Sequence, residues 1–186
     1  PSYSRDGNKI AYVCDKDGSN SIAIMNSDGT EQQILTNEFG DDRYPNISSD
    51  YKHIVFCSSR GGMNNSDYDL YLINTDGDDL RLLHDSNAYD TNPVFSPDNR
   101  YIGFISNIRG RLFSDIYLKD MDTGEVRLLT EKLDYFNQNM IFSHDNKFIL
   151  FENMGPIDSE IMLYMLNQDR IICIASNDGR DISPTL

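Results

Sequence analysis

The sequence predicts an all-β protein made of repeated four-stranded antiparallel sheets, and three observations support this prediction. Anchor residues recur along the 186-residue chain at intervals of 44, 48, 47 and 44 residues, at Pro1, Pro45, Pro93, Met140 and Pro184. Each interval contains four short runs with apolar residues at alternate positions, the period of a β-strand. Gly, Asp and Asn turns separate these runs, and no stretch has helical periodicity of useful length. The chain is therefore an array of similar units.

The first two strands of each unit are predicted to form a hairpin. In the third unit, alternating runs flank the turn 96–99, where Asp98 can bond to the backbone ahead of it and Asn99 tolerates a positive φ. Ile102 and Phe104 then lie on one face of the sheet and Ile105 on the other. The same frame recurs in the other units, at 1–12, 45–56 and 140–151.

Two further strands complete each unit. A third apolar run follows the hairpins at 22–25, 70–73, 116–118 and 163–166, and a fourth follows at 33–36, 81–83, 127–130 and 171–174. A four-stranded unit of about 45 residues, repeated around an axis, is typical of a β-propeller blade. Such a sheet can bury both faces only against its neighbours. A helical solenoid is excluded because the apolar period is two rather than 3.6.

We therefore predict a single β-propeller domain over residues 1–186. Its four blades are expected at about 1–43, 44–91, 92–138 and 139–182, with 183–186 starting a further unit.

The repeat resembles a known family. The pattern Asp-x-x-Pro-x-Phe-Ser-Pro-Asp at 90–98, together with Ile24-Met25-Asn26-Ser27-Asp28-Gly29 and Leu35-Thr36, resembles the TolB-like, WD-related propeller repeat. Met140 replaces the proline of this repeat, Tyr51 replaces its turn glycine, and the chain lacks the tryptophan of true WD repeats. The resemblance covers essentially the whole chain.

The resemblance implies a parent ring of six to eight blades. We therefore expect these four units to be a segment of a larger ring, or to pair with a second chain as a homo-oligomer. Closure as a small ring is the alternative.

The net charge of −14 limits the choice of partners. A nucleic-acid backbone or an anionic membrane would repel the chain, so no nucleic-acid partner is expected. No apolar run approaches the roughly 18 residues of a membrane helix, so no membrane insertion is expected either. A neutral or cationic ligand fits better, although acidity also serves solubility.

The three cysteines, Cys14, Cys57 and Cys173, all lie in apolar strand runs. We interpret them as small buried hydrophobic residues. Their odd number and the lack of CxxC spacing argue against a zinc site and a disulfide framework, and a single bridge between Cys14 and Cys57 stays open.

The candidate binding residues lie on loops. In a propeller, the connections from strand four to the next strand one and from strand two to strand three share one rim. Four polar residues stand three positions before an anchor and would ring the pore there: Asp42, Asp90, Asn137 and Asp181. The alternatives are that they bond to the backbone of a neighbouring blade or that a hard cation relieves their repulsion. Neighbouring residues that could stack on or clamp a small polar ligand are Arg43, Tyr44, Tyr89, Tyr135 and Phe136.

The connections between strands two and three vary more, as recognition loops do. They contain three cations in an acidic chain, Arg60, Arg109 and Arg111, which either contact a ligand or balance nearby aspartates. The segment Asp15-Lys16-Asp17-Gly18-Ser19-Asn20 superficially resembles a calcium loop, but it lacks the EF-hand spacing and is better interpreted as a hairpin turn.

No catalytic motif was found. The chain has neither a Gly-x-Ser-x-Gly elbow nor His-Glu-x-x-His, and its three histidines stand at different repeat positions. We therefore expect a non-catalytic binding or scaffold module without a cofactor or metal, which recognises a protein or a small polar ligand through one loop rim. The alternative is the propeller cap of a larger enzyme, such as a serine peptidase, with its catalytic residues outside this chain. The resemblance implies a periplasmic or extracellular location, and a cytoplasmic one stays open.

Overall fold

The computed structural model shows an all-β protein. It describes residues 1–36, 40–61, 67–110, 114–131, 133, 136–155 and 159–176. Within these ranges the chain forms four antiparallel four-stranded sheets and no helix, which confirms the predicted fold class. The described residues therefore also contain no helix long and apolar enough to cross a membrane.

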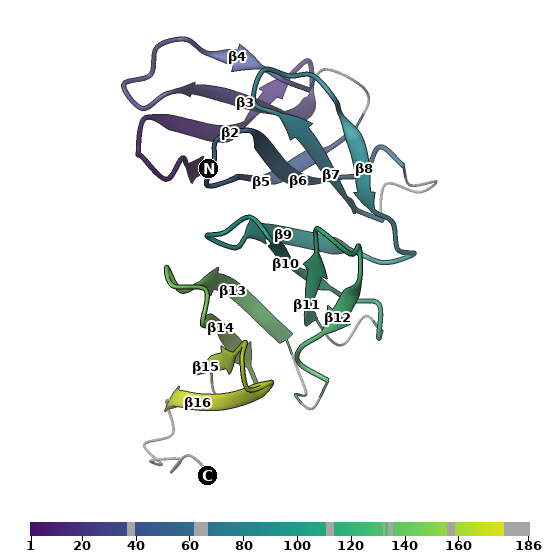
Figure 1. Cartoon of the computed structure of the whole chain (residues 1–186). Coiled ribbons are helices and arrows are strands. Elements are labelled where there is room, and N and C mark those ends of the chain that lie inside the picture. Colours follow the sequence, from purple (N-terminus) through teal and green to yellow (C-terminus); the bar gives the residue numbers. More distant parts are fainter. Residues whose placement is uncertain are drawn as a thin grey trace. The chain divides into compact units, whose positions relative to one another are not determined.

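Each sheet takes its four strands in chain order (Figure 1). The first sheet contains β1 (Ser2–Tyr3), β2 (Lys9–Lys16), β3 (Ser19–Asn26) and β4 (Gln33–Ile34). The second contains β5 (Asp42–Ile47), β6 (His53–Ser58), β7 (Asp69–Asn74) and β8 (Arg81–His84). The third contains β9 (Asp90–Phe95), β10 (Tyr101–Ser106), β11 (Asp115–Asp120) and β12 (Val126–Leu128). The fourth contains β13 (Phe136–Phe142), β14 (Phe148–Met154), β15 (Ser159–Met165) and β16 (Arg170–Ser176).

The chain divides into two compact units, Pro1–Phe95 and Ser96–Leu186. The first unit holds the first two sheets and β9, and the second unit holds β10–β12 and the fourth sheet. The assignment of 1–186 to one propeller domain, with the blade ranges given above, stays a prediction.

The repeated Ser-x-Asp sequence forms the turn between the first two strands of every sheet. In the third sheet, the Ser96 hydroxyl donates to Asp98 Oδ1 at 2.6 Å and accepts from the Tyr101 backbone N–H at 2.8 Å. The same two bonds recur at Ser4, Ser48 and Ser143. The turn residue after the aspartate has a positive φ in each case, at Gly7, Tyr51, Asn99 and Asn146. The motif is therefore a locally bonded hairpin turn.

The Leu-Thr pair after the fourth strand also has a structural role. The Thr36 hydroxyl accepts the Ile22 backbone N–H at 2.8 Å, and the Thr130 hydroxyl accepts that of Ile116 at 3.0 Å. In both sheets the threonine satisfies a buried backbone donor of the third strand, as buried backbone groups require.

The core of the first unit lies between its two sheets. Ile22, Ile24 and Leu35 on one side pack against Phe56 and Tyr71 on the other, in one buried cluster. The Phe56 and Tyr71 rings are stacked, with centroids 6.0 Å apart. Burial against a neighbouring sheet is the packing predicted for this repeat.

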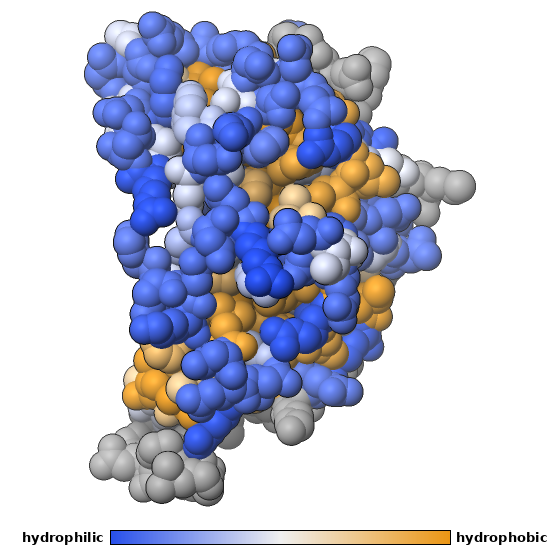
Figure 2. Space-filling view, viewed as in Figure 1, coloured by the Kyte–Doolittle hydropathy of each residue, from blue (hydrophilic) through white to orange (hydrophobic). Residues whose placement is uncertain are grey.

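The outermost strands are less buried than the inner ones. Ile34 in β4, Leu82 in β8 and Ile174 in β16 are exposed. On the face in view in Figure 2, apolar side chains reach the surface in patches bordered by hydrophilic residues. Single exposed apolar residues such as Ile34 are common on the surfaces of folded proteins.

The interpretation of the cysteines needs a correction. All three are free thiols, so no bridge joins Cys14 to Cys57, and only Cys57 is buried. Cys14 lies near the hairpin end of β2 and Cys173 lies in the outer strand β16, and both are half-buried. Burial raises the pKa of the Cys57 thiol to about 12, which leaves it uncharged and unreactive at neutral pH.

The segment 15–20 is a hairpin turn, as predicted. Asp15 pairs with Asn20 in the β2–β3 ladder, and Asp17 and Gly18 have φ values of 54° and 85°. Two consecutive positive φ values are typical of the two-residue turn that joins antiparallel strands.

Candidate functional site

The predicted polar ring residues are buried. Asp42 and Asp90 begin strands of the first unit and Asn137 lies in β13 of the second, and all three side chains are almost fully covered. Asp181, Tyr135 and Arg111 lie outside the described residues. Whether the ring residues line one pore, and whether they bind a ligand, stays a prediction.

Asp42 forms an ion pair inside the second sheet. Arg60 Nη2 lies 2.6 Å from Asp42 Oδ2, and the Arg60 Nε–H donates to the Ser58 hydroxyl at 2.9 Å. The guanidinium also lies over the rings of Phe56 and Tyr71, at 5.5 and 5.2 Å from their centroids. Arg60 therefore balances a buried carboxylate, the second of its two predicted roles.

Asp90 belongs to a second acidic group in the same unit. Its Oδ2 accepts the Ser86 hydroxyl at 2.7 Å and lies 3.8 Å from His84 Nε2. The Ser86 backbone N–H donates to Asp69 Oδ1 at 3.2 Å, so one serine links two buried carboxylates. Burial raises the pKa of Asp69, and the neighbouring Asp85 and Asp90 add to this effect.

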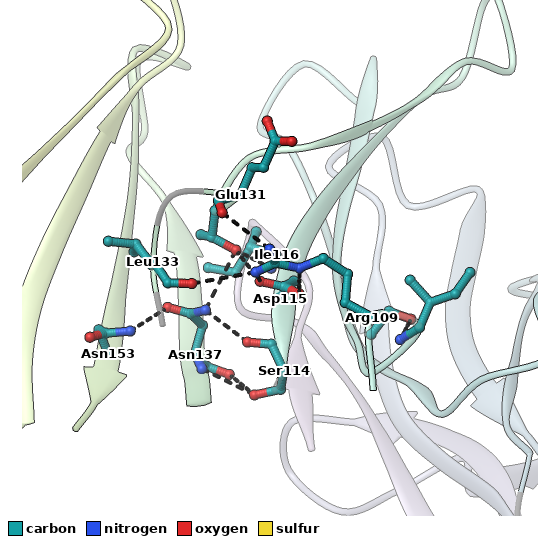
Figure 3. A network of polar contacts seen from close by, with 11 residues as sticks. Arg109, Ser114, Asp115, Ile116, Glu131, Leu133, Asn137 and Asn153 are labelled. Carbon is teal, nitrogen blue, oxygen red and sulfur yellow. Dashed lines mark hydrogen bonds and ion pairs between the residues drawn. The ribbon is translucent and has the colours of Figure 1, made fainter. Parts of the chain in front are cut away.

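Asn137 bonds to the backbone of the preceding sheet (Figure 3). Its Nδ2 donates to the Ser114 carbonyl at 2.7 Å, and its Oδ1 accepts from Asn153 Nδ2 at 3.0 Å. The Asn137 backbone N–H also donates to the Ser114 carbonyl, at 2.9 Å. These contacts match the alternative in which the repeated polar residue holds two neighbouring sheets together.

Arg109 forms an ion pair with a buried aspartate of the same unit (Figure 3). Its Nε and Nη2 form a bidentate pair with the buried Asp115, at 2.6 Å each. The guanidinium also donates to the backbone carbonyls of Glu131 at 3.1 Å and Leu133 at 3.3 Å. Bidentate pairing fixes an arginine strongly. Arg109 therefore connects the start of β11 to the segment that follows β12.

The first unit carries a polar and aromatic group that is partly open to solvent. Its members come from the connections that precede β5, β7 and β9 and from the start of β5, and we call them the rim cluster: Asp41, Arg43, Tyr44, Tyr68 and Tyr89. Arg43, Tyr44 and Tyr89 were predicted as site residues. The cluster is the part of the candidate site that combines exposed surface with fixed geometry.

Asp41 is the centre of the rim cluster. Its Oδ2 accepts from Arg43 Nη2 at 2.5 Å and from the Tyr68 hydroxyl at 2.6 Å, and its Oδ1 accepts from Asn20 Nδ2 at 2.6 Å. Burial raises the pKa of Asp41, but hydrogen bonds from Arg43, Tyr68 and Asn20 outweigh it and hold the pKa at about 2. Asp41 is therefore a carboxylate at physiological pH.

The Arg43 guanidinium, the buried Tyr68 ring and the half-buried Tyr89 ring lie next to one another. The Arg43 guanidinium lies 5.6 Å from the centroid of the Tyr68 ring, and the Tyr68 and Tyr89 centroids are 4.8 Å apart with the rings tilted by 60°. The hydrogen bond to Asp41 raises the pKa of Arg43 further, so its charge is permanent. The cation is thus held by a carboxylate on one side and an aromatic face on the other.

Tyr44 has an unusual backbone conformation. Its φ is 54°, and Asn92 and Asn139 take the same left-handed conformation at the corresponding positions of β9 and β13. In β5 and β13 this residue lies where the strand pairing shifts register, as in a β-bulge. Asparagine tolerates this conformation, whereas tyrosine adopts it only at a cost. The Tyr44 side chain is 44% exposed.

The pKa of Asp41 leads to a first prediction. Because the folded-state pKa is lowered from 3.8 to about 2, the stability that Asp41 contributes is present above its ordinary pKa and is lost as the pH falls toward 2. We expect the stability advantage of the wild type over Asp41→Asn to shrink by roughly 2 kcal/mol between about pH 5 and pH 2. Urea unfolding across this range measures it. Asp17→Asn, at an exposed turn, is the control, and a pH-independent difference for Asp41→Asn would contradict the expectation.

Sequence reasoning missed Asp41, Tyr68 and Asn20. Asp41 stands next to the predicted Asp42, and only the chain path shows that the first of the two aspartates faces the partly exposed cluster. Tyr68 and Asn20 are 27 and 21 residues away from Asp41. The expectation that the connection between strands two and three shares a rim with the connection before the next strand one could have suggested that these residues meet.

In the described part of the chain, no three His, Cys, Asp or Glu side chains are grouped so that they could hold a metal ion. Asp181, one of the four predicted ring residues, is not covered by this observation. The cation alternative therefore finds no donor set among the residues whose positions are known.

Comparison with solved structures identifies the architecture. TolB from Acinetobacter baumannii aligns with 94% of this chain at 23% identity and a TM-score of 0.74. A TolB-type protein from Agrobacterium tumefaciens aligns with 94% at 20% identity and a TM-score of 0.78. The fold is that of a TolB-like β-propeller. The TolB-like resemblance stated from the repeat is thus confirmed for the fold.

Other proteins share the TolB-like architecture. An oligogalacturonate lyase in complex with manganese aligns with 95% of this chain at 16% identity and a TM-score of 0.75. This chain spans 42% and 63% of the two TolB chains and 52% of the lyase. No protein-family model and no curated protein sequence matches the chain. At these identities the TolB-like fold is shown, and function has to be argued from the site.

Proposed function

We propose that the chain is a non-catalytic binding or scaffold module whose rim cluster recognises a protein segment or a small polar ligand. Tyr44 is the observation that carries this proposal. A bulky residue in the left-handed region costs roughly 1 kcal/mol or more, and such strain persists where it serves a function. The asparagines at the corresponding positions avoid that cost, so the exposed tyrosine has a use other than stability.

The neighbours of Tyr44 suit recognition. Arg43 is held by Asp41 and Tyr68 before any ligand arrives, so little side-chain entropy is lost on binding. Tyrosine and arginine are also the residue types that dominate binding energy at protein interfaces. A partner can stack on Tyr44 and place a hydrogen-bond acceptor against the outer edge of Arg43.

Tyr44→Asn tests this proposal. Short peptides selected from a random display library on the wild-type chain, and polar fragments screened by ligand-observed NMR, are titrated against the variant. We expect binding to weaken about tenfold or more, which is typical of a lost aromatic anchor. We also expect the unfolding midpoint to stay equal or rise, because asparagine relieves the backbone strain.

Tyr3→Asn is the matched control, because it removes a tyrosine that is 64% exposed in the same unit and lies outside the rim cluster. It should leave the binding of the selected ligands unchanged. Ligands that bind the wild type and Tyr44→Asn equally well would show that the rim cluster is not the recognition site.

A second candidate function is the propeller cap of a larger enzyme. It is favoured by the similarity of this fold to a puromycin hydrolase, with a TM-score of 0.73, of which this chain spans 29%. The Gly-x-Ser-x-Gly elbow is not found in this sequence. An α/β domain with a Gly-x-Ser-x-Gly elbow encoded in the same reading frame would support the cap function over the first proposal.

A further inference from the structure

One face of the fourth sheet is apolar but only partly buried. Ile141, Leu150, Leu163 and Ile172 pair across the four strands of this sheet and form one row on that face. Ile141 is 56% exposed, and the other three side chains are half-buried. Phe151 points to the opposite face and is almost fully buried. We call the face that carries this row of four residues the open face.

The same positions are buried in the other three sheets. The residues that correspond to the pair Leu150 and Leu163 are Ala11 and Ile24 in the first sheet, Val55 and Leu72 in the second, and Gly103 and Leu118 in the third. All six are buried. The fourth sheet is therefore like the others in the apolar character of this face and differs from them in its burial.

The first strand of the next sheet covers this face in the first three sheets. β5 contacts β2 and β3, β9 contacts β6 and β7, and β13 contacts β10 and β11. Met140 in β13 lies so close to Gly103 that a Cβ atom on the glycine would meet the methionine Cε at 2.7 Å. Each of these sheets thus buries the face under a strand that follows it in the chain.

Backbone hydrogen bonds attach the start of the covering strand. The Asp90 N–H donates to the Tyr68 carbonyl at 2.8 Å, and the Asn137 N–H donates to the Ser114 carbonyl at 2.9 Å. Each acceptor stands immediately before the last ladder pair that joins strands two and three of the preceding sheet. Ser159 holds this place in the fourth sheet, where the ladder is one pair longer.

The sequence that follows β16 has the pattern of a covering strand. Residues 181–186 have an aspartate, a proline three positions later and an apolar residue two positions after that, as do 42–47 and 90–95. Four residues separate this segment from β16, and five separate β8 from β9. Residues 177–186 lie outside the described part of the chain. Their spacing and composition match the strand that covers this face in the other sheets.

We propose that residues 181–186 lie along the open face of the fourth sheet as an extended segment, as β13 lies along the third sheet. Pro184 and Leu186 cover Leu150, and the Asp181 N–H donates to the Ser159 carbonyl. The open face is thus a docking surface for a segment of the same chain. It shares no residue with the rim cluster and does not depend on the function proposed for that cluster.

The sizes of the facing residues agree with this arrangement. In the third sheet, the glycine at 103 lies under the long side chain of Met140. In the fourth sheet, the corresponding residue is the larger Leu150, and the residue that corresponds to Met140 is the smaller Pro184. A large residue on the sheet therefore meets a small one on the covering segment, and the reverse, as close packing requires.

Methyl NOEs of the isotope-labelled chain test the arrangement directly. We expect NOEs between the methyl groups of Leu186 and those of Leu150. Isotope filtering in an equal mixture of labelled and unlabelled chains should show that they arise within one molecule. NOEs that arise only between molecules would identify a second copy of the chain as the occupant. That result, or the absence of any NOE from Leu186 to this face, would overturn the proposal.

Ile141→Glu changes the open face from the sheet side, and the exposure of Ile141 lets the core stay intact. A carboxylate beside the apolar segment should shift the docking equilibrium roughly tenfold toward release, because docking then buries a charge. The Leu186–Leu150 NOEs should weaken accordingly. Ile108→Glu is the matched control, since Ile108 is 54% exposed and lies between β10 and β11. Unchanged NOEs in Ile141→Glu, or equal losses in both variants, would contradict the assignment.

Leu186→Asp changes the same contact from the side of the segment. Amide hydrogen exchange at Leu150 and Leu163 should become about tenfold faster, because the sheet face is uncovered more often. Thr185→Asp is the control, since neighbouring residues of an extended segment point to opposite sides. Equal effects of the two variants would show that residues 181–186 do not lie on the face as an ordered strand.

Discussion

Replacing Arg60 by alanine is expected to lower the free energy of unfolding by about 3–5 kcal/mol. The side chains of Arg60 and Asp42 are only 9% and 1% exposed. Without the guanidinium, the Asp42 carboxylate would stay buried with no opposite charge, and such a charge is far more costly than the intact pair. The stacking of Arg60 on Phe56 and Tyr71 would be lost as well.

The hydrogen bonding of this pair strengthens the expectation. Only one oxygen of Asp42 is bonded to Arg60, and among the described residues neither Asp42 Oδ1 nor Arg60 Nη1 has a hydrogen-bond partner. The carboxylate therefore has no alternative donor there that could replace the lost one.

Urea unfolding of three variants measures the effect. Arg60→Ala should show the full loss, and the double variant with Asp42→Asn should recover part of it, because the buried charge is then removed too. Arg81→Ala is the control. Arg81 pairs with Asp79 at the surface, and its removal should cost less than about 1 kcal/mol. A loss of that small size for Arg60→Ala would contradict a stabilising role for the buried ion pair.

Replacing Phe56 by alanine is expected to lower the free energy of unfolding by about 3–5 kcal/mol. The reason differs from that for Arg60. The Phe56 side chain is fully buried in the core between the first two sheets and is stacked on Tyr71. Truncation removes the apolar contacts of the ring and leaves a cavity that the rigid neighbouring strands cannot close.

Phe136→Ala provides the comparison, because Phe136 is 48% exposed in β13. Removing this ring should lower the free energy of unfolding much less, since about half of its surface already contacts water. Urea unfolding compares the two variants, and amide hydrogen exchange should show the loss of protection in β6 and β7 of Phe56→Ala. Equal losses for the two variants would mean that the sheet interface of the first unit does not carry the core.

The local features of the fold could be predicted because their bonds are local. The Ser96 turn is closed by bonds to residues two and five positions away, so a short stretch of sequence contains all its partners. The period-two apolar runs likewise define each strand without knowledge of its neighbours. The positive φ expected at Asn99 follows from the same local chemistry.

The candidate site was less predictable because its partners are distant in sequence. Arg43 and Tyr89 could be selected as residue types suited to binding, but not Tyr68 and Asn20, which donate to Asp41 from 27 and 21 positions away. Whether Asp42 would face a ligand or Arg60 depended on packing within the second sheet.

The amino-acid sequence alone determined the repeat, the four strands of each unit and the turns between them, since these depend on side-chain period and on bonds within a few residues. The tertiary structure decided which aspartates are buried in ion pairs and where Arg43 meets the Tyr68 ring. The physical reason is that burial and electrostatic pairing depend on which sheets and loops meet, and several of these contacts join residues far apart in the chain, such as Asp41 with Asn20 and Tyr68 at 21 and 27 positions.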